Sequence, residues 1–125
     1  MTDTAGTGAD KPWPTELRLH KDRRTLAIAF DTGERFELPA EYLRVKSPSA
    51  EVQGHSAAER KLVPGKKNVH IAKIDAVGNY AVKLTFDDGH STGIYSWSYL
   101  HRLIVKGDEL FAAYVAELEA AGLKR

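Results

Sequence analysis

Apolar and polar residues alternate along several short stretches of the chain, and this period of two predicts half-buried β-strands. In the first half of the sequence such strands are expected over residues 15–19, 25–30 and 34–38. Leu26, Ile28 and Phe30 then share one face of the middle strand. The charged run 21–24 predicts the first turn. Asp31-Thr32-Gly33 predicts the second, since glycine accepts the positive φ that this kind of hairpin requires.

The second half of the sequence shows the same pattern. Strands are expected over residues 69–75, 80–86 and 90–95, with a hairpin at Asp87-Asp88-Gly89. Residues 26–33 match residues 82–89 at a constant offset of 56 positions. Each of these two hairpins is followed by a Tyr-Leu pair, at 42–43 and at 99–100. The sequence therefore predicts two strand–turn–strand–helix units that pack their apolar faces together, in an antiparallel, β-rich α+β fold.

Helix signals accompany these strands. Pro39 is expected in the first turn of the first short helix, where its missing N–H is harmless. Ser96 or Ser98 is expected to cap the second helix, and Asp108 a C-terminal helix that Gly122 is placed to end. The apolar stripe of this last helix, at helical spacing, comprises Leu110, Phe111, Tyr114, Val115 and Leu118.

Two segments lack any periodicity. Residues 47–67 are mostly polar and small, and an irregular stretch of this length inside a small domain is typical of a functional loop. Residues 1–12 have little to bury and are expected to form a disordered tail. The remaining residues, 13–125, are expected to form a single domain.

Composition narrows the function classes. Eighteen basic and seventeen acidic side chains give a net charge of +1, so the charge balance gives no reason to expect binding to nucleic acid or to a membrane surface. The chain has no cysteine, which excludes disulfides, thiol nucleophiles and cysteine ligands to zinc or to iron–sulfur clusters. No run approaches the roughly 18 apolar residues of a membrane-spanning helix. Residues 1–10 also lack the features of a signal peptide. We therefore expect a soluble, cytoplasmic protein.

The residues by themselves predict no reaction. His20-Lys21-Asp22 has the spacing of part of a non-haem iron site but lies in a charged turn, and the chain is too short for an oxygenase barrel. Asp87, Asp88 and His90 surround a hairpin tip, where such groups usually complete turn hydrogen bonds. His55 lies in the irregular loop, where sites are often found. The basic residues from Arg60 to His70 are interpreted as a solvated loop.

Three stretches carry a resemblance to a known family: residues 38–45 with 47–55, residues 77–82, and residues 86–97. The third reads Phe-Asp-Asp-Gly-His-Ser-Thr-Gly-Ile-Tyr-Ser-Trp. On these motifs, approximately residues 15–105 resemble the gamma-butyrobetaine hydroxylase-like N-terminal domain family, a domain of unknown function. Bacterial members of that family are stand-alone proteins of about this size. Similar domains precede the oxygenase domain of carnitine-synthesis hydroxylases, and others are fused to P-loop ATPases that carry iron–sulfur clusters in plastids.

The resemblance also implies a metal position. In the hydroxylases this domain holds a structural zinc through three cysteines and a histidine, which fall here at Ser47, Ser49, Val52 and His90. Only His90 retains a good zinc ligand, since a serine hydroxyl is not ionised near neutral pH and valine has no donor atom. We therefore expect neither a bound metal nor a cofactor. Hydroxylase activity does not follow, because the oxygenase domain is absent from this sequence.

These considerations lead to a non-catalytic binding or adaptor domain that assists a protein partner, such as an iron–sulfur carrier P-loop ATPase or another metal-handling protein. The expected contact surface is the loop Ser47–His55 with the edge Tyr95–Trp97, and Arg44 and Trp97 are the expected anchors, since Arg and Trp are enriched among interface hot spots. The structural alternative is that Trp97 is a core residue and that Arg44 pairs with a carboxylate such as Glu41.

A second functional hypothesis stays open. The chain would then be a small-ligand-binding protein or a minor enzyme with a polar pocket around Arg44, His55 and His90.

Overall fold

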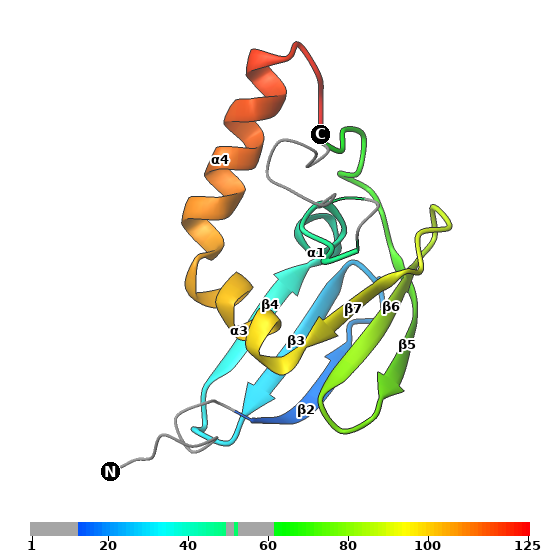
Figure 1. Cartoon of the computed structure of the whole chain (residues 1–125), viewed down its shortest axis with the longest axis vertical. Coiled ribbons are helices and arrows are strands. Elements are labelled where there is room, and N and C mark those ends of the chain that lie inside the picture. The colour runs from blue at the N-terminus through cyan, green and yellow to red at the C-terminus, as the bar shows by residue number, and fades with distance from the viewer. Residues whose placement is uncertain (1–12, 50–51, 53–61) are drawn as a thin grey trace.

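The fold consists of two similar β-sheets with helices along one side (Figure 1). The computed structural model describes residues 13–49, 52 and 62–125. In this part of the chain one antiparallel sheet has the order β2-β3-β4 and the other the order β5-β6-β7. The strands are β2 (Pro14–Leu19), β3 (Thr25–Phe30), β4 (Arg35–Pro39), β5 (Ile71–Val77), β6 (Ala81–Phe86) and β7 (Gly93–Ser96). The helices are α1 (Ala40–Val45), α3 (Trp97–Val105) and α4 (Gly107–Ala120). The α+β prediction is confirmed.

The two predicted hairpins have the same turn geometry, including equivalent backbone hydrogen bonds. The two hairpin glycines have the positive φ that the turns require, +89° at Gly33 and +93° at Gly89. Phe30 N–H donates to the Glu34 carbonyl at 2.9 Å, and Phe86 N–H donates to the His90 carbonyl at the same distance. Each sheet then leads directly into a helix, α1 or α3.

The two units hold each other through their helices. The Tyr42 hydroxyl of α1 donates to the Leu103 carbonyl of α3 at 2.7 Å, and the Tyr99 hydroxyl of α3 donates to the Lys46 carbonyl at the end of α1 at 2.6 Å. Tyr42 and Tyr99 are the equivalent tyrosines of the repeat, so the contact is reciprocal. The acceptors lie at helix C-termini, where carbonyls lack partners within the helix. Burial raises the pKa of Tyr42 to about 12, so this donor keeps its proton.

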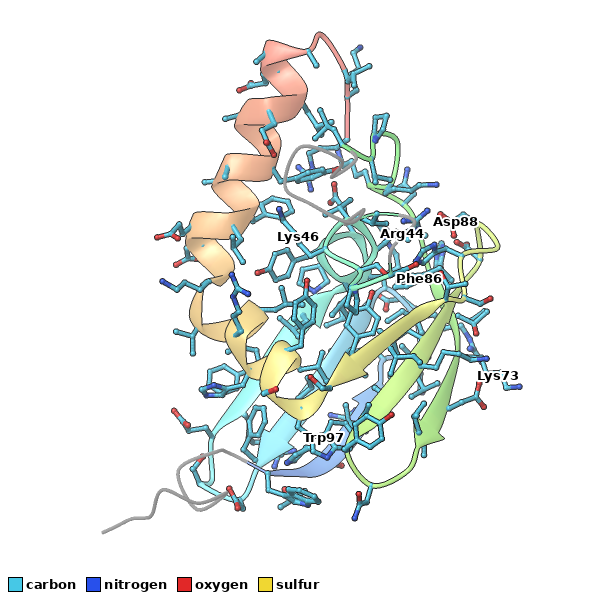
Figure 2. The ribbon with its side chains drawn as sticks, viewed as in Figure 1. Arg44, Lys46, Lys73, Phe86, Asp88 and Trp97 are labelled. Atoms are coloured by element: carbon cyan, nitrogen blue, oxygen red, sulfur yellow. The ribbon has the colours of Figure 1, made fainter. Side chains whose placement is uncertain are left out.

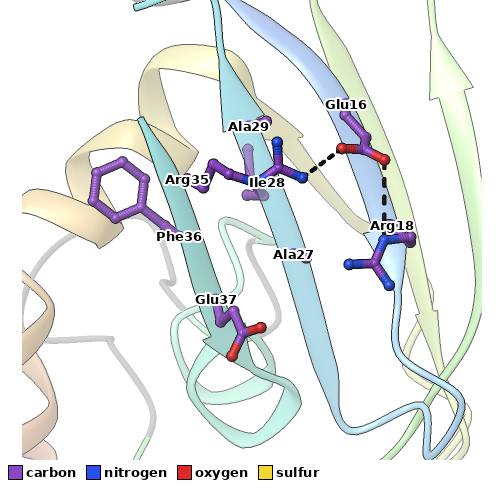
Figure 3. Close-up of a pocket in the computed structure, with 8 residues that line it drawn as sticks. All are labelled: Glu16, Arg18, Ala27, Ile28, Ala29, Arg35, Phe36 and Glu37. Atoms are coloured by element: carbon purple, nitrogen blue, oxygen red, sulfur yellow. Dashed lines mark hydrogen bonds and ion pairs between the residues drawn. The ribbon is translucent and has the colours of Figure 1, made fainter. Parts of the chain in front are cut away.

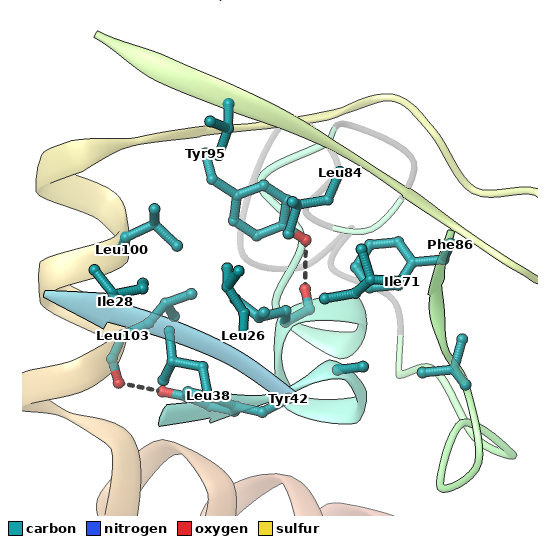
Figure 4. Packing of buried hydrophobic residues seen from close by; sticks show 14 of the residues in the cluster. Leu26, Ile28, Leu38, Tyr42, Ile71, Leu84, Phe86, Tyr95, Leu100 and Leu103 are labelled. Carbon is teal, nitrogen blue, oxygen red and sulfur yellow. Dashed lines mark hydrogen bonds between the residues drawn. The ribbon is translucent and has the colours of Figure 1, made fainter. Parts of the chain in front are cut away.

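One hydrophobic core lies between the sheets and the helices (Figure 4). Its most buried members come from both units. All six residues expected to share a core are in it: Leu26, Ile28, Phe30, Val82, Leu84 and Phe86. The alternation in the sequence therefore assigned the inner faces of β3 and β6 correctly.

The helix ends agree with expectation at two places and differ at two. Pro39 does not lie in the first turn of α1: it ends β4 and is the N-cap residue of the helix, with extended backbone. Ser96 caps α3, accepting from Tyr99 N–H at 3.1 Å, and Gly122 (φ +72°) ends α4. The prediction that Asp108 caps α4 is wrong. The Lys106 carbonyl already accepts a hydrogen bond from Leu110 N–H, so α4 starts directly after α3 and Asp108 falls in its first turn.

None of the helices in the described ranges has the length and apolarity needed to cross a membrane.

Candidate functional site

The tip of the β6–β7 hairpin gathers several of the predicted site residues around one carboxylate. Asp88 Oδ2 lies 2.8 Å from Arg44 Nε, which α1 supplies, and 2.6 Å from Lys66 Nζ, which the segment before β5 supplies. The three side chains are 17%, 12% and 22% exposed, respectively. Burial by itself would raise the pKa of Asp88. Hydrogen bonds from Lys66, the His90 N–H and Arg44 outweigh this effect and hold the pKa at about 2.

A buried polar cluster adjoins this tip. Ser47 Oγ lies 2.9 Å from His90 Nε2, and Ser49 Oγ lies 2.6 Å from Thr92 Oγ1. Ser47, Ser49 and His90 are all buried. Gly93 makes the close approach feasible, since a Cβ at this position would collide with Ser47 Oγ. The segment after α1 is thereby hydrogen-bonded to the second hairpin, which links the two units.

The cluster does not have the donor atoms of a zinc site. Three of its residues, Ser47, Ser49 and His90, occupy positions at which the resemblance implies metal ligands, and the chain does bring Ser47 and His90 into contact. Val52, the third of these positions, is buried and offers no donor. The described residues contain no group of three or more His, Cys, Asp or Glu side chains able to hold a metal ion. Two hydroxyls and one imidazole do not replace the thiolates of a structural zinc site.

The Ser47–His90 pair is also unsuited to nucleophilic catalysis. Such a pair requires a serine whose hydroxyl can reach a substrate carbonyl. Ser47 is completely buried, and its oxygen additionally accepts the Ser49 N–H at 3.3 Å. These contacts are those of a structural cross-link.

Arg44 is largely buried and does not lie where an exposed interface anchor would be expected. Its guanidinium is largely enclosed, and its carboxylate partner is Asp88 rather than Glu41. Glu41 is itself buried and accepts two hydrogen bonds from Arg125, at 2.9 and 2.7 Å. Arg44 does pair with a carboxylate, as the structural alternative expected, but the carboxylate is that of Asp88. Glu41, the example named there, is bound by Arg125, 84 positions away.

Tyr95 does not belong to any surface. The register pairs it with Val82 on the core side of the sheet, so its ring is completely buried. Its hydroxyl donates to the Leu43 carbonyl (Figure 4). The prediction that Tyr95 contributes to an exposed contact edge is therefore wrong. The outward residue of this strand is Ile94, which is 46% exposed.

Trp97 lies at the other end of the second sheet from Arg44 and Asp88 (Figure 2). Its Nε1–H donates to the Asn79 carbonyl at 2.9 Å, and its ring meets that of Trp13 edge to face, with centroids 6.4 Å apart. Trp13 is 50% exposed and Tyr80 is 55% exposed. The Trp97 N–H donates to the Tyr80 carbonyl, which joins these residues into one group. We call the group of Trp13, Tyr80 and Trp97 the aromatic surface.

The remaining predicted site residue, His55, lies outside the residues that the structure describes. Arg44 and His90 do meet at Asp88, whose two oxygens accept from the Arg44 Nε–H and the His90 N–H. The predicted site residues thus separate into a hairpin-tip cluster, an aromatic surface and a core tyrosine.

A hollow of about 480 Å³ lies on the outer face of the first sheet, away from these residues (Figure 3). Ala27 and Ala29 form its floor, and charged side chains of β2 and β4 form its walls. Glu16 pairs with Arg35 at 2.9 Å and with Arg18 at 3.9 Å. The carboxylate of Glu16 thus pairs with an arginine from each of these two strands.

Sequence reasoning missed Lys66 as a partner of Asp88 and Trp13 as a partner of Trp97. Both partnerships join residues far apart in the sequence. The one local signal was the pair of aspartates in the Asp87-Asp88-Gly89 turn, of which the second faces the cations.

Residues 17–101 match the family model described as gamma-butyrobetaine hydroxylase-like, N-terminal. Two proteins with NMR solution structures are similar over most of the chain. One is 50% identical with a TM-score of 0.78, covering 100% of this chain and 90% of that one. The other is 45% identical with a TM-score of 0.79, covering 92% and 90%. A crystal structure of a protein of unknown function of the DUF971 family, from Acidithiobacillus ferrooxidans, is 38% identical with a TM-score of 0.60, covering 72% and 90%. No curated protein matches the chain.

Proposed function

Since the chain belongs to the gamma-butyrobetaine hydroxylase-like N-terminal domain family, we propose that it is a non-catalytic binding domain that contacts a protein partner through the aromatic surface. The observation that carries this proposal is the exposure of Trp13 and Tyr80 beside Trp97. Large aromatic side chains gathered at a surface are typical of interfaces, where Trp and Tyr dominate the binding energy.

The aromatic surface is also held in place before any partner arrives. The backbone of Trp13 is tied to Asp31 in both directions, with its carbonyl accepting at 2.8 Å and its N–H donating at 3.2 Å. Trp97 is fixed through Asn79 and Tyr80. Side chains that are already ordered lose less conformational entropy on binding, which favours affinity.

The buried state of the polar candidates supports a non-catalytic role. Ser47, Ser49 and His90 are buried and hydrogen-bonded among themselves or with Thr92. Groups in this condition stabilise the fold and have no route to a substrate.

For the partner we propose a protein that carries an iron–sulfur cluster or handles metal. The support is the resemblance to domains fused to iron–sulfur carrier ATPases, combined with the lack of any cysteine here. Without a thiolate the chain has no ordinary ligand for a cluster, so the cluster would stay on the partner.

The test is the affinity for the cell's own cluster-carrier ATPase, measured by calorimetry with the wild type, Trp13→Ala and Tyr80→Ala. Each variant is expected to weaken binding at least about 10-fold, or about 1.4 kcal/mol. Val105→Ala is the matched control, because Val105 is 65% exposed and belongs to the far end of α3. If the wild type does not bind, the partner is wrong. If it binds and both aromatic variants bind equally well, the surface is wrong.

A further inference from the structure

A groove of about 290 Å³ lies between β4 and the junction of α3 and α4, and we call it the β4 groove. Most of its lining is apolar and comprises Phe36, Leu38, Tyr42, Ile104 and Phe111. Phe36, Ile104 and Phe111 are only half-buried, so apolar surface stays accessible to another molecule. Glu37 and Asp108 are exposed and also line the groove, which gives it an acidic rim.

Beside this groove the first sheet ends in an open edge. β4 is an outer strand of the sheet, on the side where α4 begins (Figure 1). Phe30 and Glu34 form a hydrogen-bonded pair across β3 and β4, and such pairs alternate with non-bonded ones along antiparallel strands. Arg35 and Glu37 therefore direct their N–H and carbonyl groups away from β3. Their side chains are 68% and 63% exposed, and no other described residue forms a hydrogen bond with these backbone groups.

An exposed strand edge beside an apolar groove is an arrangement that binds extended peptides. The peptide adds a strand to the sheet, its backbone hydrogen bonds give affinity, and the groove selects its side chains. Charge complementarity narrows the choice of peptide. Both rim residues are acidic: the Glu37 carboxylate lies 3.1 Å from His20 Nε2, and Asp108 falls in the first turn of α4. An acidic rim favours a basic residue of the peptide over an acidic one.

We propose that the β4 edge and the β4 groove bind an extended peptide segment of a partner protein, with an apolar side chain in the groove and a basic side chain beside Asp108. Pro39 offers no N–H and ends the strand, so the pairing is short and involves Arg35 and Glu37. This inference does not rest on the aromatic surface, because none of its three residues lines the groove. The two surfaces can therefore be tested separately.

Phage display of random ten-residue peptides on the full chain supplies the probes. Each selected peptide is synthesised and titrated by fluorescence anisotropy against the wild type, Glu37→Pro and the matched control Glu37→Gln. Proline is tolerated in an edge strand where the N–H faces away from the sheet, so Glu37→Pro removes a donor that the peptide needs and keeps the bonds to β3. For at least one peptide we expect binding to weaken at least about 10-fold with Glu37→Pro and less than about 3-fold with Glu37→Gln.

A second pair of variants tests the groove. A Cβ at Gly107 would meet no atom within 4 Å, so a side chain fits there without displacing a neighbour. Gly107 lines the groove, and Gly107→Leu should therefore narrow it. We expect Gly107→Leu to weaken binding of the same peptide at least about 10-fold, and the control Gly107→Ala to change it less than about 3-fold.

Methylation of the peptide's backbone amides gives a readout that does not require a variant to fold. Alternate amides of a paired strand point in opposite directions, so methylating one alternate set should weaken binding at least about 10-fold and methylating the other should not. Amide hydrogen exchange at Arg35 and Glu37 should slow at least about 10-fold when the peptide binds.

Three results would overturn the proposal. The first is that the two methylated forms of every selected peptide bind alike. The second is that folded Glu37→Pro and Glu37→Gln bind every selected peptide equally well. The third is that the wild type sediments as a dimer that Glu37→Pro converts into a monomer, because a second copy of the chain then occupies the edge.

Discussion

Replacing Arg125 by alanine should destabilise the fold, because it removes the ion-pair partner of the buried Glu41 carboxylate. Glu41 is 5% exposed, and its carboxylate accepts from Arg125 Nε–H at 2.9 Å and from Arg125 Nη2–H at 2.7 Å. The Arg125 guanidinium also covers the Phe111 ring at 5.2 Å. In the variant the carboxylate stays buried and loses its cation.

The magnitude follows from this geometry. Removing one partner of a fully buried ion pair costs about 3–5 kcal/mol. The Arg125 side chain is 40% exposed, so water can reach Glu41 from that side once the guanidinium is gone. The remaining contact, from the Tyr114 hydroxyl at 3.5 Å, is long. We therefore expect the free energy of unfolding to fall by about 2 kcal/mol, below the range for a fully buried pair.

Urea unfolding monitored by tryptophan fluorescence measures this change. Lys124→Ala is the control, since Lys124 contributes a backbone carbonyl to Gly65, which the substitution keeps, and its side chain forms no hydrogen bond or ion pair with another described residue. Glu41→Gln added to the Arg125→Ala variant should recover part of the loss, because it removes the buried charge. A loss below about 0.5 kcal/mol, or a double variant less stable than Arg125→Ala, would refute the reasoning.

Three further predictions concern the core, the hairpin tip and the metal. Ile28→Ala and Leu84→Ala should each lower the free energy of unfolding by about 2–5 kcal/mol in urea, and losses under 1 kcal/mol would contradict the shared core. Because the pKa of Asp88 is lowered from 3.8 to about 2, its contribution of about 2 kcal/mol is complete above pH 4 and lost as the pH falls towards 2. Asp88→Asn should flatten the stability profile in that window, and an unchanged profile would argue against this assignment. Elemental analysis of protein purified without chelators should find no stoichiometric zinc; one zinc per chain that disappears in His90→Ala would overturn this expectation.

The elements of the fold could be predicted because their causes are local. Alternation of apolar residues marked the inner faces of β3 and β6, and the glycines at 33 and 89 marked the hairpins through their positive φ. The offset of 56 positions went further and predicted two packed units. Strand ends were less well predicted. β7 begins at Gly93 instead of His90, because His90 turns inward to Ser47.

Arg44, Ser47, Ser49 and His90 entered the sequence analysis through separate hypotheses, and the structure places all four near one hairpin tip. Their burial could not be foreseen, since a short run of polar residues after a helix reads equally well as a solvated loop. Tyr95 was misplaced because the strand register decides which face it lies on, and the register pairs it with the buried Val82.

By itself the sequence determined which segments are strands, where the chain turns and which faces are apolar, because each depends on neighbours a few positions apart. The tertiary structure alone decided which charged side chains pair with one another. Arg44 meets Asp88 across 44 positions and Glu41 meets Arg125 across 84. A charged side chain at a given position is compatible with any carboxylate that the fold brings within reach. Only the packing of the two units selects one, because it sets the distances on which electrostatic and hydrogen-bond energies depend.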